Sequence, residues 1–260
     1  MPGPLVVQHR TRRRRALRRR ALWTGGELLV TVGLVLLLLV VHQLWWTNRE
    51  AKAEAREGVA ALEREWAASP EESTEPAPRT SPEETSPEAA PSEASQATQP
   101  PAPQRQPTPD WSHAYAILTI PALDLRVPVA EGISKTGVLN KGYVGHYPDT
   151  QQPGRPGNFA IAGHRNTHGE PFRRLDRLGD GDEIVVETKA AVYTYAVDQT
   201  LAQTSAHDTG VIRPVPRSLV HPGRGYREPG YYLTLTTCTP EYTSRYRLVV
   251  WGTLRSMRAR

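Results

Sequence analysis

The chain contains a single cysteine, Cys238, near the end of the segment Y-Y-L-T-L-T-T-C-T-P. A lone cysteine cannot form an internal disulfide, so it serves either packing or thiol chemistry. Strand alternation places Leu233 and Leu235 on one face and Cys238 on the opposite face. Pro240 lacks an amide donor and ends the strand, which predicts that the thiol lies at a rim, where sites are commonly built. A buried cysteine acting as a small hydrophobic residue is the alternative that these residues leave open.

A nucleophilic thiol needs a base or cation that favours the thiolate and a donor that stabilises an oxyanion. A hairpin that joins residues 231–238 to 247–252 would return Arg247 close to Cys238, with Arg245 as a competitor on the same side. An arginine is always charged and presents fixed donors, which suits a substrate carbonyl or oxyanion. His164 ends the predicted strand N-F-A-I-A-G-H and can transfer a proton near neutral pH.

The spacing of His164 and His168 also matches an H-x-x-x-H zinc pattern. The intervening R-N-T contains no glutamate general base, and no helix is predicted there, so we expect no zinc site. Acidic residues are also sparse between residues 197 and 231, which argues against a calcium site. The sequence therefore predicts neither a metal nor a cofactor.

The N-terminal region predicts a membrane anchor. Residues 28–46 form an apolar run of the length that a helix needs to cross a bilayer, with Trp45 and Trp46 at its far end. Residues 1–27 contain an arginine-rich tail, which the positive-inside bias places in the cytoplasm. A cleavable signal peptide is the less favoured alternative, because the apolar run is too long and lacks a small-residue cleavage site. The position of the arginines before this span favours lipid over nucleic acid as their partner.

Residues 47–110 predict a helical stalk and a linker. Interleaved charges and high helix propensity over residues 48–68 predict a solvated helix that leaves the membrane. Residues 69–110 are rich in Pro, Glu, Ser, Thr and Ala and have almost nothing apolar to bury, which predicts a disordered tether. Residues 111–260 are then expected to form the catalytic domain.

Within residues 111–260, short apolar segments alternate with Gly, Pro, Asp and Asn, which predicts an all-β domain. The candidate strands are residues 114–120, 125–130, 158–164, 183–188, 191–197, 231–237 and 247–252, with a hairpin around 188–190. One short helix is predicted after Pro171, with Phe172, Leu175 and Leu178 facing inward. We expect a small barrel or sandwich, and closure of the sheet would remove exposed edges.

Three separated motifs resemble those of the sortase family. T-L-T-T-C resembles the T-L-x-T-C signature around the catalytic cysteine, A-G-H-R matches the catalytic histidine segment, and R-L-V-V follows at the spacing of the catalytic arginine. The resemblance covers residues 111–254 and implies a closed eight-stranded sortase-type β-barrel. The segment A-G-H-R-N-T-H-G-E-P-F and the N-terminal anchor look most like class E, housekeeping-type enzymes of high-GC Gram-positive actinobacteria.

The resemblance implies a cysteine transpeptidase outside the cell membrane. Cys238 would attack the Thr carbonyl of a Thr-Gly bond in a C-terminal sorting signal, His164 would act as general acid and base, and Arg247 would hold the oxyanion or substrate. The expected partners are surface proteins that carry an LAxTG-like or LPxTG-like signal and the amine of a lipid II-like peptidoglycan precursor, with no nucleic acid. Thr237, Tyr147 and Tyr143 are the candidate substrate-binding residues.

Two alternative functions remain open on the sequence. An L,D-transpeptidase also pairs a cysteine with a histidine, but its S-x-G-C type signature is absent because Thr237 precedes Cys238. A non-catalytic cell-wall binding or adhesion module would contain an unreactive Cys238, and its function would survive Cys238→Ala.

Overall fold

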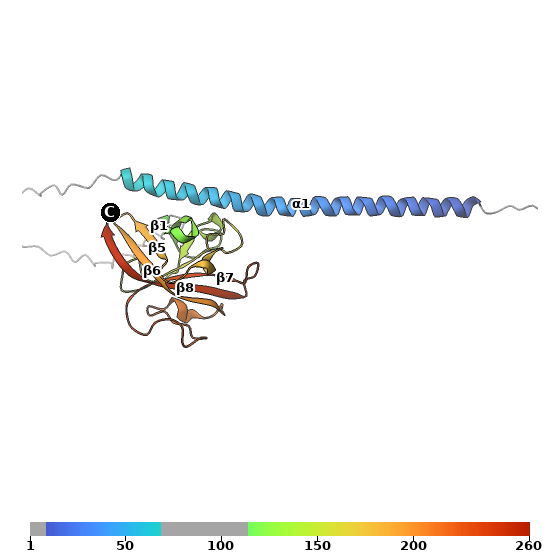
Figure 1. Cartoon of the computed structure of the whole chain (residues 1–260). Helices are drawn as coiled ribbons and strands as arrows, with labels where there is room; N and C mark the ends of the chain where they lie inside the picture. Colours follow the sequence, from blue (N-terminus) through green and yellow to red (C-terminus); the bar gives the residue numbers. More distant parts are fainter. Residues whose placement is uncertain (1–8, 69–113) are drawn as a thin grey trace, which may run out of the picture.

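The computed structural model describes residues 9–68 and 114–260, with side chains from residue 19 onwards. The described residues form one long helix, α1 (His9–Ala68), and a β-domain that packs beside its C-terminal half, while the N-terminal half extends beyond the domain (Figure 1). The linker predicted at 69–110 and the first residues of the predicted domain, 111–113, lie outside the described residues.

The domain is a closed barrel, which confirms the predicted fold class. Within residues 114–260 its strands are β1 (Ala114–Ile120), β2 (Leu125–Glu131), β3 (Val144–His146), β4 (Gly157–Ala162), β5 (Glu183–Thr188), β6 (Ala191–Ser205), β7 (Tyr231–Thr239) and β8 (Tyr246–Ala259). They follow the order β1-β2-β3-β4-β7-β8-β6-β5, and β5 pairs with β1 to close the ring. The pairs β2–β3 and β4–β7 are parallel, and the other pairs are antiparallel.

The seven predicted strands are all present, and the predicted hairpin pairs Glu187 with Val192. Prediction missed β3, because three residues are too short to show a period-two pattern. The strands predicted at 191–197 and 247–252 are also too short, because β6 continues to Ser205 and β8 to Ala259. The long β6–β8 ladder runs from Ala191↔Ala259 to Ser205↔Tyr246, and its polar outer residues give no apolar alternation at those ends.

The helix predicted after Pro171 is shorter than expected. Phe172, Leu175 and Leu178 are buried as predicted, but only Leu175–Arg177 forms a helical turn, η3, of the 3₁₀ type. The Phe172 amide donates to the carbonyl of His164 (3.0 Å) rather than to a helical partner. The segment after Pro171 is therefore held by a hydrogen bond to the backbone of His164. A helical pattern of apolar residues cannot predict such a bond.

The prediction of a solvated helix over 48–68 is wrong in one respect. The segment is helical, but Ala51, Ala55, Val59 and Leu62 are buried in a stripe against the barrel. On this face Glu63 pairs with Arg126 at 2.7 Å. The sequence did not predict this buried face, because alanines between charged residues do not form a clear apolar stripe. They become a contact surface only where the barrel packs against them.

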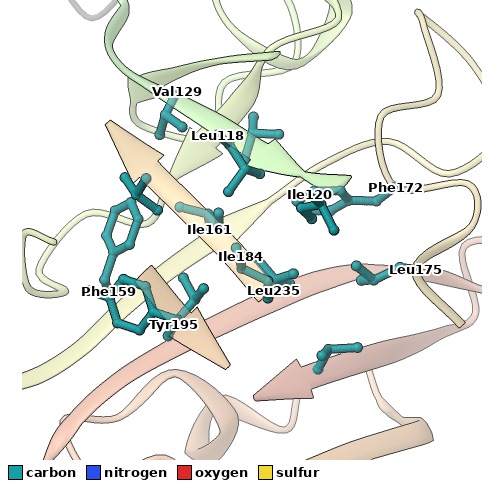
Figure 2. Packing of buried hydrophobic residues seen from close by; sticks show 14 of the residues in the cluster. Leu118, Ile120, Val129, Phe159, Ile161, Phe172, Leu175, Ile184, Tyr195 and Leu235 are labelled. Carbon is teal, nitrogen blue, oxygen red and sulfur yellow. The ribbon is translucent and has the colours of Figure 1, made fainter. Parts of the chain in front are cut away.

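The barrel interior forms the main hydrophobic core. Figure 2 shows Leu118, Ile161 and Leu235 projecting into the space that the strands enclose. Phe172 and Leu175 also belong to this core, so the loop after β4 is anchored in the barrel interior. Towards its N-terminus, α1 is long and apolar enough to cross a membrane, and its large apolar side chains from Leu28 to Trp46 are exposed.

Candidate active site

Cys238 and His164 both line one cleft, of about 750 Å³, at one end of the barrel. Its walls come from the middle of α1, from Lys135 in the loop between β2 and β3, from the loop that follows β4, and from the end of β7 with the loop that follows it. The lining includes Leu44, Thr47, Asn48, His164, Arg165, His168, Glu170, Cys238, Tyr242 and Ser244. The structure therefore brings together the thiol and the imidazole that the sequence placed 74 positions apart.

Cys238 is the penultimate residue of β7 and is partly exposed as a free thiol. Leu233 and Leu235 of the same strand are fully buried in the core, so the predicted separation of faces is confirmed. Thr237 is buried beside the cysteine, and its hydroxyl donates to the carbonyl of Gly163 at 2.8 Å. This bond joins β7 to the loop that carries His164, next to the position where the strand presents the thiol.

Arg247 is the direct cross-strand partner of Cys238 in the antiparallel β7–β8 ladder. Directly paired residues project from the same face of a sheet, so the predicted return of this arginine is confirmed. Its Nη1 donates to the carbonyls of Ser244 (2.9 Å) and Tyr246 (3.0 Å), and the guanidinium is outside the described lining of the cleft. Arg245 is exposed and stacks over the ring of Tyr246 at 5.2 Å.

His164 lies two residues beyond the end of β4, whereas the sequence predicted that it ends the strand. Its Nε2 is 3.0 Å from Oδ1 of Asn140. An amide oxygen only accepts hydrogen bonds, so this contact assigns the hydrogen to Nε2 and leaves Nδ1 as the basic nitrogen of the neutral ring. Burial, with smaller contributions from His168 and Lys135, lowers the pKa of His164 to about 4.

Close packing fixes the loop that carries His164. A Cβ atom at Gly163 would lie 2.8 Å from the ring of Phe172, so no larger residue fits without moving that buried ring. The Gly163 amide also donates to the carbonyl of Thr236 (3.2 Å) and extends the contact between this loop and β7. The imidazole is therefore placed by the residues on each side of it.

Arg165 connects the histidine segment to the cysteine strand, and sequence reasoning assigned it no role. Its side chain is 93% buried, and the guanidinium donates to Thr239 Oγ1 (2.9 Å) and to the Cys238 carbonyl (3.4 Å). It also pairs with Asp176 at 3.4 Å. Its position directly after His164 in A-G-H-R was the available signal, but the contacts depend on the fold.

The three candidate substrate-binding residues lie outside the described cleft lining. The Tyr147 hydroxyl is 2.9 Å from Thr236 Oγ1, on the strand that carries Cys238. Tyr143 is buried against Ala55 of α1. The Thr237 hydroxyl donates to the carbonyl of Gly163 within the protein. Among the described residues, no group of three or more His, Cys, Asp or Glu side chains is arranged to hold a metal ion.

A closed β-barrel that presents a cysteine and a histidine in one cleft has the pair of groups that nucleophilic thiol catalysis uses. The Sortase domain family model matches residues 118–255. The chain is 40% identical over 240 residues to sortase SrtE1 of Streptomyces coelicolor, a match that covers 90% of this chain and 57% of SrtE1. It is 34% identical to SrtE2 of the same organism, covering 88% of this chain and 80% of SrtE2.

Solved structures agree with this assignment. The crystal structure of sortase E1 from Streptomyces coelicolor, with a tripeptide in its active site, shares 48% identity over 57% of this chain and 92% of that chain, with a TM-score of 0.54. Sortase E from Streptomyces avermitilis shares 39% identity over the same fractions, with a TM-score of 0.51. The chain belongs to the sortase family, whose members are membrane-anchored cysteine transpeptidases, and the predicted resemblance to class E is confirmed.

Proposed function

We propose that this protein is a single-pass membrane transpeptidase whose N-terminus is cytoplasmic and whose barrel is extracellular. It would cleave a C-terminal sorting signal between Thr and Gly and join the protein to the amine of a lipid II-like peptidoglycan precursor. The observation that carries the proposal is the shared cleft of Cys238 and His164, with Arg247 paired to Cys238 across the ladder.

In the first half-reaction, Cys238 Sγ attacks the carbonyl carbon of the signal threonine while Nδ1 of His164 accepts the thiol proton. Burial lowers the pKa of His164 to about 4, so the ring is neutral at pH 7 and Nδ1 is free to take the proton, and the negative charge of the thiolate then stabilises the imidazolium that forms. The tetrahedral intermediate then collapses, the C–N bond to glycine breaks, and His164 returns the proton to the leaving amine. Cys238 is left in a thioester with the threonine carbonyl.

In the second half-reaction, the amine of the acceptor attacks the thioester carbonyl and transfers a proton to His164. The C–S bond breaks, Cys238 leaves as a thiolate, and His164 reprotonates it. The new bond is an amide, so one peptide bond replaces another and no oxidant, reductant or external energy source is needed.

Arg247 would stabilise the oxyanion or hold the substrate backbone. Its contacts with the Ser244 and Tyr246 carbonyls keep it close to the ladder, and exchange of these carbonyls for a substrate oxygen would bring the guanidinium to the reacting carbonyl. The class E similarity supports a Leu-Ala-x-Thr-Gly signal over Leu-Pro-x-Thr-Gly. Thr237, Tyr147 and Tyr143 remain the predicted substrate-binding residues, with Thr237 favoured by its position next to Cys238.

The test uses the purified full chain in detergent micelles with LAxTG and LPxTG peptides and a short amine-bearing peptide as acceptor. We expect cleavage between Thr and Gly, a thioester adduct on Cys238 by intact mass, and a transpeptidation product. His164→Ala should lower kcat about 10²- to 10⁴-fold. No cleavage by the native chain, or cleavage that survives Cys238→Ala, would contradict the proposal.

The two arginines provide a matched pair of variants in the same assay. Arg247→Ala should lower kcat about 10²- to 10³-fold, the range measured when one oxyanion donor is removed. Arg245→Ala removes the same charge two residues away and should leave turnover within about twofold, because exposed residues away from a site contribute little. Equal losses in the two variants would assign the effect to net charge instead of to Arg247.

A further inference from the structure

The anchor helix itself contributes to the cleft. Leu44, Thr47 and Asn48 of α1 line the cleft together with His164 and Cys238. Leu44 also lies in the apolar stretch that is expected to cross the membrane. The catalytic cleft is therefore partly formed by the segment that joins the anchor to the barrel.

Asn48 makes two hydrogen bonds with the loop that follows His168. Its Nδ2 donates to Glu170 Oε1 at 2.9 Å, and its Oδ1 accepts from the Gly169 amide at 3.3 Å. His168, Gly169 and Glu170 have φ values of 53°, 83° and 54°, three consecutive residues in the left-handed region. Backbone of this kind persists only where the surroundings determine it, and Asn48 bonds two of the three residues.

Glu170 needs these contacts. Only 10% of its side-chain surface is exposed, and a carboxylate that is so buried must be paired and hydrogen-bonded. Asn48 bonds Oε1, while Arg173 bonds Oε2 at 2.8 Å. Arg173 in turn donates to the hydroxyl of Tyr242 at 3.3 Å, in the loop that follows Cys238. A chain of polar contacts thus joins α1, the histidine loop and the cysteine loop.

The position of Asn48 is set independently of these bonds. One helical turn further along α1, Ala51 is buried against the barrel, and a Cβ atom at Gly142 would lie 2.6 Å from the Ala51 carbonyl. Tyr143 packs beside Ala55 on the same face. Because α1 is docked on the barrel, the Asn48 side chain is held in place and can fix the loop that it contacts. A side chain on a free helix could not do so.

We propose that Asn48 is a positioning residue for His164, acting through the loop 168–170. The ring of His168 stacks on that of His164, with centroids 5.2 Å apart and an interplanar angle of 29°. By holding Gly169 and Glu170, Asn48 fixes His168 and with it one face of the catalytic imidazole. The helix that continues from the membrane anchor then supports the active site, and this inference rests on the proposed function for its turnover readout.

The primary test compares Asn48→Ala with Glu50→Ala in the full chain in detergent micelles. Glu50 is exposed on the same helix, so its variant controls for a change in α1 alone. We expect Asn48→Ala to lower kcat about 10- to 100-fold, because small misplacement of a catalytic group is costly, with KM nearly unchanged. Hydrogen exchange of the amides of residues 165–172 should accelerate only in Asn48→Ala. Unchanged kcat in that variant, or exchange no faster than in Glu50→Ala, would overturn the proposal.

A rescue experiment separates positioning from general destabilisation. Asn48→Asp keeps an acceptor for the Gly169 amide but places a second carboxylate against Glu170, so we expect a loss of kcat. Adding Glu170→Gln lets the new amide at position 170 donate to the new carboxylate at position 48, which reverses the direction of the native hydrogen bond. This double variant should recover most of the lost kcat. Glu170→Gln alone serves as the reference variant. The proposal would be contradicted if the double variant were no more active than Asn48→Asp.

The outcomes for the proposed function and for Asn48 are distinguishable. If the native chain cleaves no sorting-signal peptide, the proposed function fails, but hydrogen exchange of residues 165–172 still reports whether Asn48 holds the loop. If the native chain cleaves peptides and exchange is the same in Asn48→Ala and Glu50→Ala, only the positioning role fails.

Discussion

Cys238 lies in a regular β-ladder, whereas His164 lies in a loop held mainly by side chains and single hydrogen bonds. The thiol belongs to β7, which is paired along its length with β8 and, through Tyr231–Thr236, with β4. The imidazole lies beyond the end of β4 and depends on Asn140, the packing of Phe172 on Gly163 and, through His168, on α1. Two kinds of structure therefore meet in one cleft.

The difference indicates which half of the site is robust. A ladder position is specified by many backbone hydrogen bonds, so one side-chain change nearby moves it little. A loop position is specified by a few contacts, and each of them is a place where geometry can be lost. Substitutions around the histidine loop should therefore change catalysis more per unit of lost stability than substitutions in the β7–β8 hairpin.

The largest effect is expected at the nucleophile. Cys238→Ala should abolish thioester formation and turnover, because no other cysteine exists in the chain. The side chain is partly exposed and has no core role, so the thermal unfolding temperature should change by only a few degrees. Intact mass and a thermal melt of the same sample provide the two measurements. A large drop in the unfolding temperature would mean that the thiol packs in the core, as in the non-catalytic alternative.

Gly163 tests most directly whether the histidine loop depends on a few close contacts. An added methyl would lie 2.8 Å from the Phe172 ring and must displace the loop or the ring. We expect Gly163→Ala to cost about 1–3 kcal/mol, the range for overpacking, and to lower kcat beyond what partial unfolding explains. Chemical denaturation and turnover in the same buffer provide the test. Full activity in this variant would show that the histidine loop is less constrained than its packing indicates.

Arg165 tests the connection between the two regions. Arg165→Met keeps the apolar stem but leaves the hydroxyl of Thr239 and the Cys238 carbonyl without this donor. We expect a loss of about 1–3 kcal/mol, typical when a buried hydrogen-bond partner is removed. Arg165→Lys should recover little, since one ammonium cannot reproduce the planar fork. Recovery in the lysine variant would show that charge alone is sufficient.

The smallest effect concerns pH. Burial lowers the pKa of His164 from 6.5 to about 4, so between these values the unfolded chain binds more protons than the folded chain. The contribution of this residue to stability is present above pH 6.5 and is lost as pH falls towards 4. The unfolding temperature of His164→Gln should therefore fall less than that of the native chain between pH 7 and pH 5. Parallel curves would indicate that His164 is solvated in the folded state.

The chemistry and the order of the segments could be predicted from the sequence. A lone cysteine after an alternating strand, an A-G-H-R segment and a following strand with arginine are local patterns, and local patterns record strand faces and motif spacing. The apolar run at 28–46 and seven of the strands were predictable for the same reason. These features depend on residues close together along the chain.

Tertiary structure alone decided how the site is supported. The supporting contacts join residues that are far apart in sequence. They are the burial of Ala51 against the barrel, the hydrogen bonds of Asn48 with Gly169 and Glu170, and the hydrogen bonds of the Arg165 guanidinium. Asn48 and Glu170 are 122 positions apart, and nothing in either local sequence specifies the other. The sequence by itself determined which residues can react, and only packing decided which residues hold them in place, because a contact between distant segments exists only after the barrel has closed and α1 has docked.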